Sequence, residues 1–336
     1  MAAPDAPAPS PVPTAARVAV ASILCFFISC LFHLDLAYQS LITVYIVNLI
    51  YPLGPFQKGM ERLVGRVGGV AYGAAVSVLL QGSPGLILTA MVVFQLIVWY
   101  MNAASRLPYA GLHLGLFSAT TAATGLFGSS QAAVDTAIAT AIQIVLGVFV
   151  AELVNMLAAD PGPIRIDTGT NPLFPLRREW VLASLRVTLA SLGGLFLAGI
   201  FELPLVPTMA SAMLITQAGD PAAAKWKAYL RMLGAVTGVI YCVPVLELLA
   251  HVPSLGLLIG FIFLGIFAGQ LLAHTSVDYG YLGFQFGLTV GLILAGKPAE
   301  LSDLRTGLQR MVGVVGGTGI AIIAVAAIPA PKPKAQ

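Results

Sequence analysis

The chain has 336 residues, of which 58% are hydrophobic and only 9% are charged. A soluble domain carries about 25% charged residues, so a chain this apolar cannot cover a water-facing surface and belongs in a bilayer. The net charge of +3 does not indicate a partner, and we expect no nucleic-acid binding.

The two ends of the chain and its cysteines carry no functional signal. Residues 1–13 are rich in Ala and Pro and lack a basic residue, so they do not resemble a secretory signal. We expect disordered tails at 1–13 and 329–336. Cys25, Cys30 and Cys242 lie inside apolar runs, and their spacing indicates neither a metal site nor a disulfide framework.

Twelve apolar segments follow in chain order, most of them near the length of about 20 residues that a membrane-spanning helix needs. They predict an all-α integral membrane protein with about twelve transmembrane helices, six in a module at 14–157 and six in a module at 182–328. A polar cytoplasmic linker is expected at 158–181. The expected helices are 16–34, 38–54, 60–81, 84–101, 106–128, 132–157, 182–201, 204–219, 228–250, 253–273, 278–296 and 304–328.

The second and eighth of these segments are short, and each has a proline near its end, at Pro52 and Pro55 or at Pro221. Short or interrupted spans at matching positions of two halves often mark the substrate site of a transporter. Two helices that simply end at a turn would give the same pattern, so both interpretations stay open.

The two halves repeat one another at an offset of 169 residues. Residues 17–22 (RVAVAS) return as residues 186–191 (RVTLAS). With an even number of spans each, both halves should enter the membrane in the same direction, as parallel six-helix repeats about an axis along the membrane normal. The most faithful copy is Lys58, Arg62, Gly65, Gly69 and Tyr72, which return as Lys227, Arg231, Gly234, Gly238 and Tyr241.

The distribution of Lys and Arg predicts the orientation, because cytoplasmic segments of membrane proteins carry an excess of both. If the N-terminus is cytoplasmic, only Lys297, Arg305 and Arg310 lie on the opposite side. We therefore expect both termini in the cytoplasm of a multi-pass inner (plasma) membrane protein. The cytoplasmic cations are then Arg17, Lys58, Arg62, Arg66, Arg106, Arg165, Arg177, Arg178, Arg186, Lys225, Lys227, Arg231, Lys332 and Lys334.

The copied residues fall on one face of the third and ninth helices. Glycines four residues apart allow close contact between membrane helices. The cations are either anchors that reach lipid headgroups or an anion site in which arginines bind a carboxylate. The candidate substrate-binding residues on this face are Lys58, Arg62 and Tyr72, with Lys227, Arg231 and Tyr241.

The fifth and eleventh helices carry a second copied motif. Tyr109 and His113 match Tyr281 and Gln285 at an offset of 172 residues. A polar residue inside an apolar run must face protein or water. Because Gln285 can form hydrogen bonds but cannot titrate, we favour a hydrogen-bonding role for His113, and proton coupling stays the alternative.

Glu152, near the cytoplasmic end of the sixth helix, is a second coupling candidate. A charge pair with Arg62, Arg66 or Arg106 that fixes the helices is the favoured interpretation. The sequence contains no phosphate loop, His–Glu metal motif or nucleophile elbow, so we expect no enzyme activity, cofactor or metal.

Two stretches resemble one known family. Residues 202–215 (ELPLVPTMASAMLI), followed by a basic turn and residues 227–238 (KAYLRMLGAVTG), resemble the fusaric acid resistance / aromatic acid exporter family, and residues 57–69 fit the same pattern. The resemblance covers both halves and implies an inner-membrane efflux protein for aromatic carboxylic acids. It also singles out Arg62 and Arg231. Many members of this family carry large cytoplasmic domains that the linker and tail here do not match.

We therefore expect a secondary exporter of organic anions, with aromatic acids as substrates and the proton gradient or membrane potential as the driving force. Tyr72, Tyr109, Tyr241 and Tyr281 would contact the substrate. An anion channel and a non-transporting scaffold for an adaptor are the alternatives. The expected partners are membrane lipid, a second copy of the chain, and a periplasmic adaptor protein of the kind that some family members use.

Overall fold

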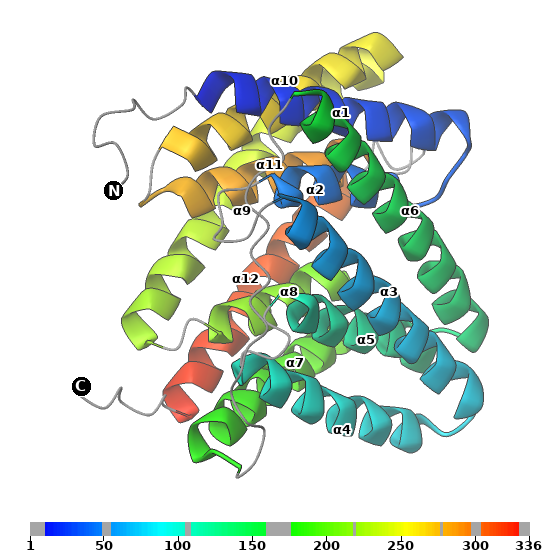
Figure 1. The fold of residues 1–336 in the computed structure, drawn as a ribbon, viewed down its shortest axis with the longest axis vertical. Coiled ribbons are helices and arrows are strands. Elements are labelled where there is room, and N and C mark those ends of the chain that lie inside the picture. The colour runs from blue at the N-terminus through cyan, green and yellow to red at the C-terminus, as the bar shows by residue number, and fades with distance from the viewer. Residues whose placement is uncertain are drawn as a thin grey trace.

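The computed structural model describes residues 11–48, 55–104, 109–158, 176–217, 220–275, 278–296 and 304–328, and this part of the chain is all α-helical (Figure 1). Every expected helix is present. The twelve helices are α1 (Pro11–Leu31), α2 (Tyr38–Val47), α3 (Pro55–Leu79), α4 (Pro84–Ala103), α5 (Ala110–Phe127), α6 (Ser130–Leu157), α7 (Arg178–Ile200), α8 (Leu205–Thr216), α9 (Pro221–His251), α10 (Leu255–Thr275), α11 (Gly280–Leu294) and α12 (Leu304–Ala327).

Seven of these helices are long and apolar enough to cross a membrane, namely α1, α4, α6, α7, α9, α10 and α12. The expectation of about twelve crossings is corrected by this count. The apolar helices α2, α8 and α11 have only 10, 12 and 15 residues, which is about 15 to 22 Å of helix against a hydrocarbon core of about 30 Å. Helix α3 carries four charged side chains in its first half. The seven long apolar helices make the chain a multi-pass membrane protein.

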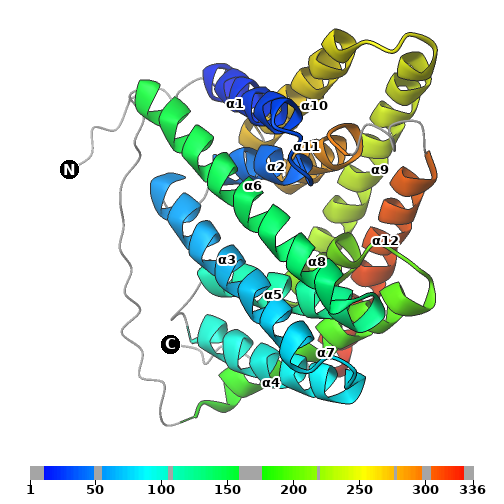
Figure 2. The same cartoon turned by 90° about the vertical axis from the view of Figure 1, so that its right-hand side faces the viewer.

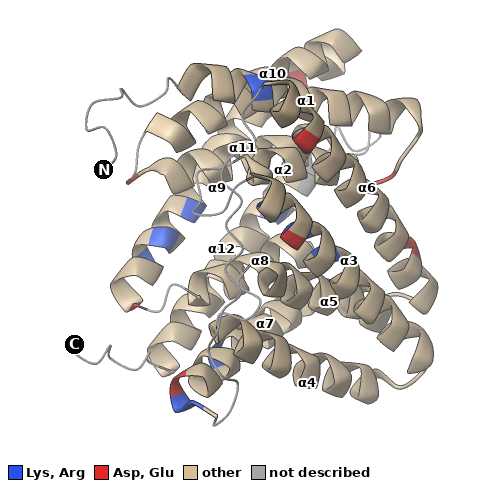
Figure 3. Ribbon diagram, in the orientation of Figure 1, with Lys and Arg blue, Asp and Glu red and all other residues tan. Residues whose placement is uncertain are grey.

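Apolar side chains cover the outer faces of the long helices. Ile138, Ile142, Val145 and Phe149 of α6 are all exposed, and their spacing places them on one face of the helix. A row of large apolar residues facing outward is unfavourable in water and suits contact with lipid. Figure 3 shows how few charged residues interrupt the ribbon, with Lys and Arg concentrated on α9 and α3.

Local signals set several helix ends. Asp220 caps α9 by accepting a hydrogen bond from the backbone N–H of Ala223 at 2.8 Å, and Pro221 takes the first helical position, where its missing N–H costs nothing. Helix α1 begins at Pro11, inside the expected tail of 1–13, and α7 begins at Arg178, inside the expected linker of 158–181. The expected tail at 329–336 lies outside the described residues.

The helices form layers that mix the two halves of the chain. Helix α1 packs against α10 at one end of the long axis, and α7 packs against α4 at the other. Inside these lie two further mixed pairs, α2 with α11 and α5 with α8 (Figures 1 and 2). Each pair joins one helix from residues 11–158 to one from residues 176–328. A space between the two inner pairs is therefore framed by both halves.

Glycines bring α3 against α5 and α9 against α11. A Cβ atom on Gly69 would lie 2.9 Å from the carbonyl oxygen of Leu114, and one on Gly238 would lie 2.7 Å from Cβ of Thr289. Real Cβ atoms do not approach other atoms this closely, so only glycine permits the contact. The expected role of the four-residue glycine spacing in close helix contact is confirmed, and Gly73 continues the row on α3.

Replacing Gly73 by Ala should destabilise the protein, because the new Cβ would lie 2.7 to 2.8 Å from Thr121 Cβ, Ala122 N and Ser118 O. Overpacking of this kind costs about 1–3 kcal/mol. The measurement is the thermal unfolding midpoint in detergent. Gly260→Ala is the matched control, because nothing lies within 4 Å of its Cβ position, so its midpoint should stay the same or rise. Equal midpoints for the two variants would contradict the role of the glycine row.

Candidate functional site

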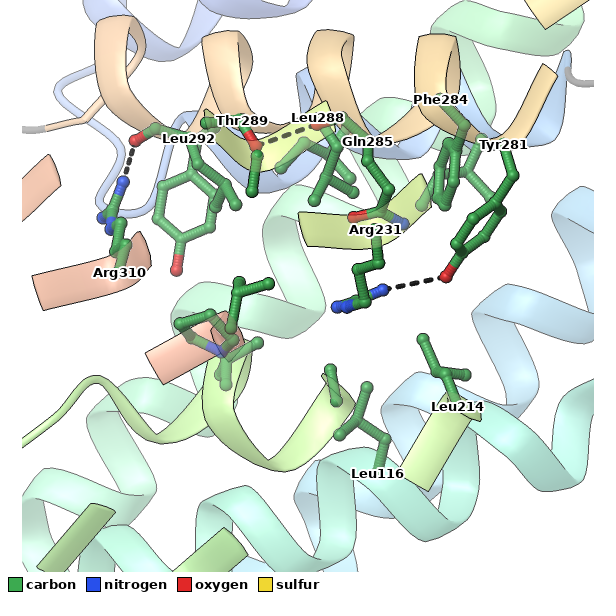
Figure 4. Close-up of a pocket in the computed structure, with 18 of the residues that line it drawn as sticks. Leu116, Leu214, Arg231, Tyr281, Phe284, Gln285, Leu288, Thr289, Leu292 and Arg310 are labelled. Atoms are coloured by element: carbon green, nitrogen blue, oxygen red, sulfur yellow. Dashed lines mark hydrogen bonds between the residues drawn. The ribbon is translucent and has the colours of Figure 1, made fainter. Parts of the chain in front are cut away.

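A cavity of about 660 Å³ lies between the two inner helix pairs. Its walls come from α2, α3 and α5 of the first half and from α8, α9, α10, α11 and α12 of the second. Figure 4 shows Arg231, Gln285 and Leu288 turned toward this space from α9 and α11. The two halves therefore share a single cavity at this position, and do not enclose it separately.

Six cationic side chains line the cavity, and no acidic side chain does so among the lining residues that the structure describes. Lys58 and Arg62 are each only 2% exposed and Arg231 only 3%, whereas Lys227 and Arg310 are half-buried. Such a field concentrates anions. The six cations are Lys58, Arg62, Arg66, Lys227, Arg231 and Arg310.

Arg62 is held by neutral acceptors from two other helices. Its Nε donates to Thr43 Oγ1 of α2 at 3.4 Å, and its Nη1 lies 3.0 Å from Nε2 of His113 on α5. Since a guanidinium can only donate, His113 Nε2 must be the acceptor in this bond, with the ring neutral. The favoured hydrogen-bonding role of His113 agrees with this geometry.

Arg231 has an equivalent environment in the second half. Its Nε donates to Ser211 Oγ of α8 at 2.9 Å, and its Nη1 donates to the hydroxyl of Tyr281 on α11 at 3.0 Å (Figure 4). Thr43 and Ser211 thus play the same part in the two halves. The acceptors for Nη1 differ, however, because the second half uses Tyr281 where the first uses His113.

The two copied lysines reach the carboxyl ends of the short helices. Lys58 Nζ donates to the carbonyl of Val47 at 3.5 Å, and Lys227 Nζ donates to the carbonyl of Leu214 at 3.2 Å. The last carbonyls of a helix have no partner within it and carry partial negative charge, so cations are favoured there. The lysines lie near the start of α3 and α9, where the helix dipole opposes them, and the ends of α2 and α8 compensate for this.

Two predicted tyrosines do not reach the cavity. The hydroxyl of Tyr72 donates to the Ala90 carbonyl of α4 at 2.9 Å, and that of Tyr241 donates to the Phe261 carbonyl of α10 at 2.8 Å. Each tyrosine lies ten residues beyond the copied arginine, about 15 Å along the helix, where its side chain reaches α4 or α10 and not the shared space. Tyr109 and Tyr281 do line the cavity.

Glu152 also lies away from the cavity. A Cβ atom on Gly59 of α3 would be 3.2 Å from Glu152 Oε1, so the carboxyl group packs beside α3. Within the described residues this oxygen has no hydrogen-bond partner. The expected charge pair with Arg62 or Arg66 is not formed, since those guanidinium groups face Thr43, and Arg106 lies outside the described residues.

The sequence analysis missed several residues of the site. Arg66 donates to Thr43 Oγ1 at 3.3 Å and stacks over the ring of Phe117, with 3.9 Å from its guanidinium carbon to the ring centroid. Arg66 is one turn from Arg62 on the same helix face, so helical spacing would have found it. Ser211 comes from a helix distant in sequence, and no local signal identifies it. Arg310 stands in an Arg-x-x-Gly sequence, Arg310–Gly313, that repeats those of Arg62 and Arg231, and this repeat is the signal that could have found it.

Comparison with known proteins places a recognisable domain in the second half. Residues 196–324 match a family model described as fusaric acid resistance protein-like. No curated protein and no solved structure matched the chain. The matched region runs from the end of α7 into α12 and contains Arg231, Tyr281, Gln285 and Arg310. Residues 196–324 therefore form a fusaric acid resistance protein-like domain of a multi-pass membrane protein.

Replacing His113 should show whether Arg62 needs its acceptor. His113→Leu leaves the Arg62 Nη1 donor without that partner and should lower the free energy of unfolding by about 1–3 kcal/mol. His113→Gln supplies an amide oxygen and should lose less than half as much. The thermal unfolding midpoint in detergent measures both. His251→Leu is the control at an exposed position, and equal losses for His113→Leu and His113→Gln would contradict the hydrogen-bonding role.

Proposed function

We propose that the protein is a secondary efflux transporter that moves organic anions, in particular aromatic carboxylates, through the shared cavity. The observation that carries this proposal is the set of six cations that line one cavity, with no acidic residue among the lining residues that the structure describes. A cavity with a cationic lining and low-dielectric walls concentrates anions, so it is suited to take an anionic substrate. The fusaric acid resistance protein-like match at residues 196–324 supports the same class of function.

The remainder of the lining favours an aromatic substrate. Leu116, Phe284 and Leu288 contribute apolar surface beside the arginines. A carboxylate can bind bidentately to a guanidinium group, while its ring packs on these side chains and on Tyr109 or Tyr281. A small inorganic anion would leave most of this apolar surface without a partner.

We also propose that the two halves are parallel six-helix modules with both termini in the cytoplasm, an arrangement in which α3, the counterpart of the crossing helix α9, crosses as well and the number of crossings is even. Support comes from equivalent contacts in the two halves. The backbone N–H of Leu34 donates to the Ser29 carbonyl at 2.8 Å, and the N–H of Leu203 donates to the Ala198 carbonyl at 2.9 Å, both at an offset of 169 residues. The exchanged pairs α1–α10 and α7–α4 have the same symmetry. The Lys and Arg distribution supports the orientation.

Replacing Arg62 and Arg231 by Gln tests the proposal directly. A hydrogen bond to a charged group contributes about 1.5–3 kcal/mol, so each single variant should raise the half-saturation concentration for benzoate about tenfold or more. The double variant should abolish flux. The measurement is benzoate efflux from proteoliposomes that hold the purified protein, with the thermal midpoint confirming that each variant is folded.

Lys225→Gln is the matched control, since it removes one exposed cation from α9 that does not line the cavity. Its flux should equal that of the wild type. If the Arg62→Gln/Arg231→Gln double variant still exports benzoate at the normal rate, the anion site is wrong. Full cellular resistance to aromatic acids in the absence of any flux would instead favour the scaffold interpretation.

The driving force is either the membrane potential or a proton gradient. An inside-negative potential assists an outgoing anion by about 2.3 kcal/mol per charge for each 100 mV. Proton coupling would use His113, because protonation of its Nε2 and donation by Arg62 exclude one another. A carboxylate that bound Arg62 would take over the Nη1 hydrogen bond, and His113 Nε2 would then be able to accept a proton. Glu152 lies away from the cavity and is the weaker candidate.

His113→Gln separates these two sources of energy. If His113 carries the proton, this variant should lose accumulation driven by a pH gradient and keep flux driven by a potassium–valinomycin potential. If the potential alone drives export, both fluxes should match those of the wild type. Proteoliposomes with each gradient imposed separately give the measurement, and loss of both fluxes at a normal thermal midpoint would contradict a role confined to coupling.

A channel is the second candidate, because the cavity follows α11 from Tyr281 to Ile293, over nearly its whole length. Single-channel current steps in planar bilayers would favour a channel, and slow saturable flux without such steps would favour a carrier. Assembly into a homo-oligomer and association with a periplasmic adaptor remain part of the proposal and can be tested by mass measurement of the purified complex.

A further inference from the structure

We propose that Arg310 forms a second anion-binding site at the end of the cavity opposite Arg231, where it takes up the transported carboxylate before release. This inference rests on the proposed function and on its orientation, which place Arg310 away from the cytoplasm. Arg231 and its partners would then load the substrate, and Arg310 would receive it.

The cavity connects the two arginines along one face of α11. Tyr281, Gln285, Leu288 and Leu292 all line it, and their spacing is that of a single helix face running from the first turn of α11 to the last. The first-half counterpart is shorter, because no lining residue of α5 lies beyond Phe117 within the described part of that helix. Of these two equivalent helices, α11 therefore lines the cavity over the greater length.

The two arginines are anchored far apart on this path. Arg231 donates to the hydroxyl of Tyr281, and Arg310 donates to the carbonyl of Leu292 (Figure 4). Tyr281 and Leu292 are eleven residues apart, which is about 16 Å along a helix. A hydrogen bond spans only about 3 Å, so a carboxylate bound to Arg231 does not contact Arg310. Two separate binding positions follow from this distance.

Differences between the two halves open the path on one side only. In the first half, Arg66 stacks over Phe117 at 3.9 Å and the pair fills the wall. The corresponding residues of the second half are Ala235, at an offset of 169, and Thr289, at an offset of 172. Both are much smaller and both line the cavity. The side-chain volume that closes the first half is therefore missing in the second.

The residue that corresponds to Arg310 in the first half is smaller and does not line the cavity. Gly147 of α6 packs against α2 as Gly317 of α12 packs against α8, which makes Thr140 the counterpart of Arg310. Thr140 is buried and accepts a hydrogen bond from Gln39 at 3.2 Å. Residues of α12 line the cavity, whereas none of the described residues of α6 does. The second half thus has a cation, Arg310, at the far end of the path, whereas the first half has the hydrogen bond between Gln39 and Thr140 at the corresponding place.

The surroundings of Arg310 suit an aromatic monocarboxylate. Its guanidinium carbon lies 5.6 Å from the ring centroid of Tyr38, and Ile293, Met311 and Val314 supply apolar surface beside it. The guanidinium can bind the carboxylate group, and the ring of the substrate can pack on Tyr38 and these aliphatic side chains. The chemistry matches that of the Arg231 end, so one substrate can occupy both positions in turn.

Sided kinetics of Arg310→Gln test this inference. The assay is 4-chlorobenzoate exchange by wild type, Arg231→Gln and Arg310→Gln in proteoliposomes of uniform orientation, with substrate added to either face. From the cytoplasmic face, Arg231→Gln should raise the half-saturation concentration about tenfold, and Arg310→Gln should leave it within about twofold while lowering the maximal rate about tenfold. From the opposite face, Arg310→Gln should raise the half-saturation concentration about tenfold, and Arg231→Gln should mainly lower the maximal rate.

Arg310→Lys keeps the charge and should restore at least about a third of the maximal rate. Thr289→Phe places in the second half the larger side chain that Phe117 has in the first. It should lower the maximal rate from both faces without changing the cytoplasmic half-saturation concentration. Lys225→Gln is the charge control. The thermal unfolding midpoint of each variant shows whether it is folded. We expect Thr289→Phe to fold, because Gly69, the counterpart of Gly238, packs beside a Phe in the first half.

Two outcomes would overturn the second site while leaving the proposed function intact. One is wild-type kinetics of Arg310→Gln from both faces. The other is an equal rise of its half-saturation concentration on both faces, which would make Arg310 part of a single site with Arg231. If the wild type exchanges no aromatic carboxylate at all, the proposed function fails, and the second site fails with it.

Discussion

Cationic side chains inside an apolar fold are the constraint on which the remainder of this structure depends. Removing an ion from water costs several kcal/mol even after relaxation, and no described acidic side chain lines the cavity to compensate for this cost. The chain uses neutral oxygens instead. Thr43 and Ser211 accept hydrogen bonds from the copied arginines, and backbone carbonyls accept from the copied lysines. An anionic substrate in the cavity would offset the remaining free-energy cost of these cations.

This requirement explains the short helices α2 and α8. A helix that crossed the whole bilayer would present its last carbonyls at the surface, whereas these two end within reach of Lys58 and Lys227 inside the fold. Their truncation supplies buried acceptors with partial negative charge. The glycine rows on α3 and α9 then bring α5 and α11 close enough to complete the wall with His113 and Tyr281.

The two halves hold their copied arginines in similar ways and differ in the other residues that line the cavity. Equivalent hydroxyls hold both arginines, yet the third cation of each half comes from a different helix, α3 for Arg66 and α12 for Arg310. Arg66 stacks on Phe117 in the cavity wall of the first half, and the smaller Thr289 stands at the place that corresponds to Phe117 in the second. Two sequence-related halves can therefore line one cavity with different side chains at its two ends.

The sequence by itself determined the membrane class, the twelve helices, the close glycine contacts and the copied pairs Lys58–Lys227 and Arg62–Arg231, because composition and helical spacing act locally along the chain. Tertiary structure alone decided that both arginines face one cavity, that Tyr72 and Tyr241 turn away from it, and that Arg310 joins it. It also set the helix lengths, by which seven of the described helices have the length and hydropathy to cross the membrane. The reason is physical, since a cavity is the space that helices distant in sequence leave unfilled when they pack, and no local pattern encodes it.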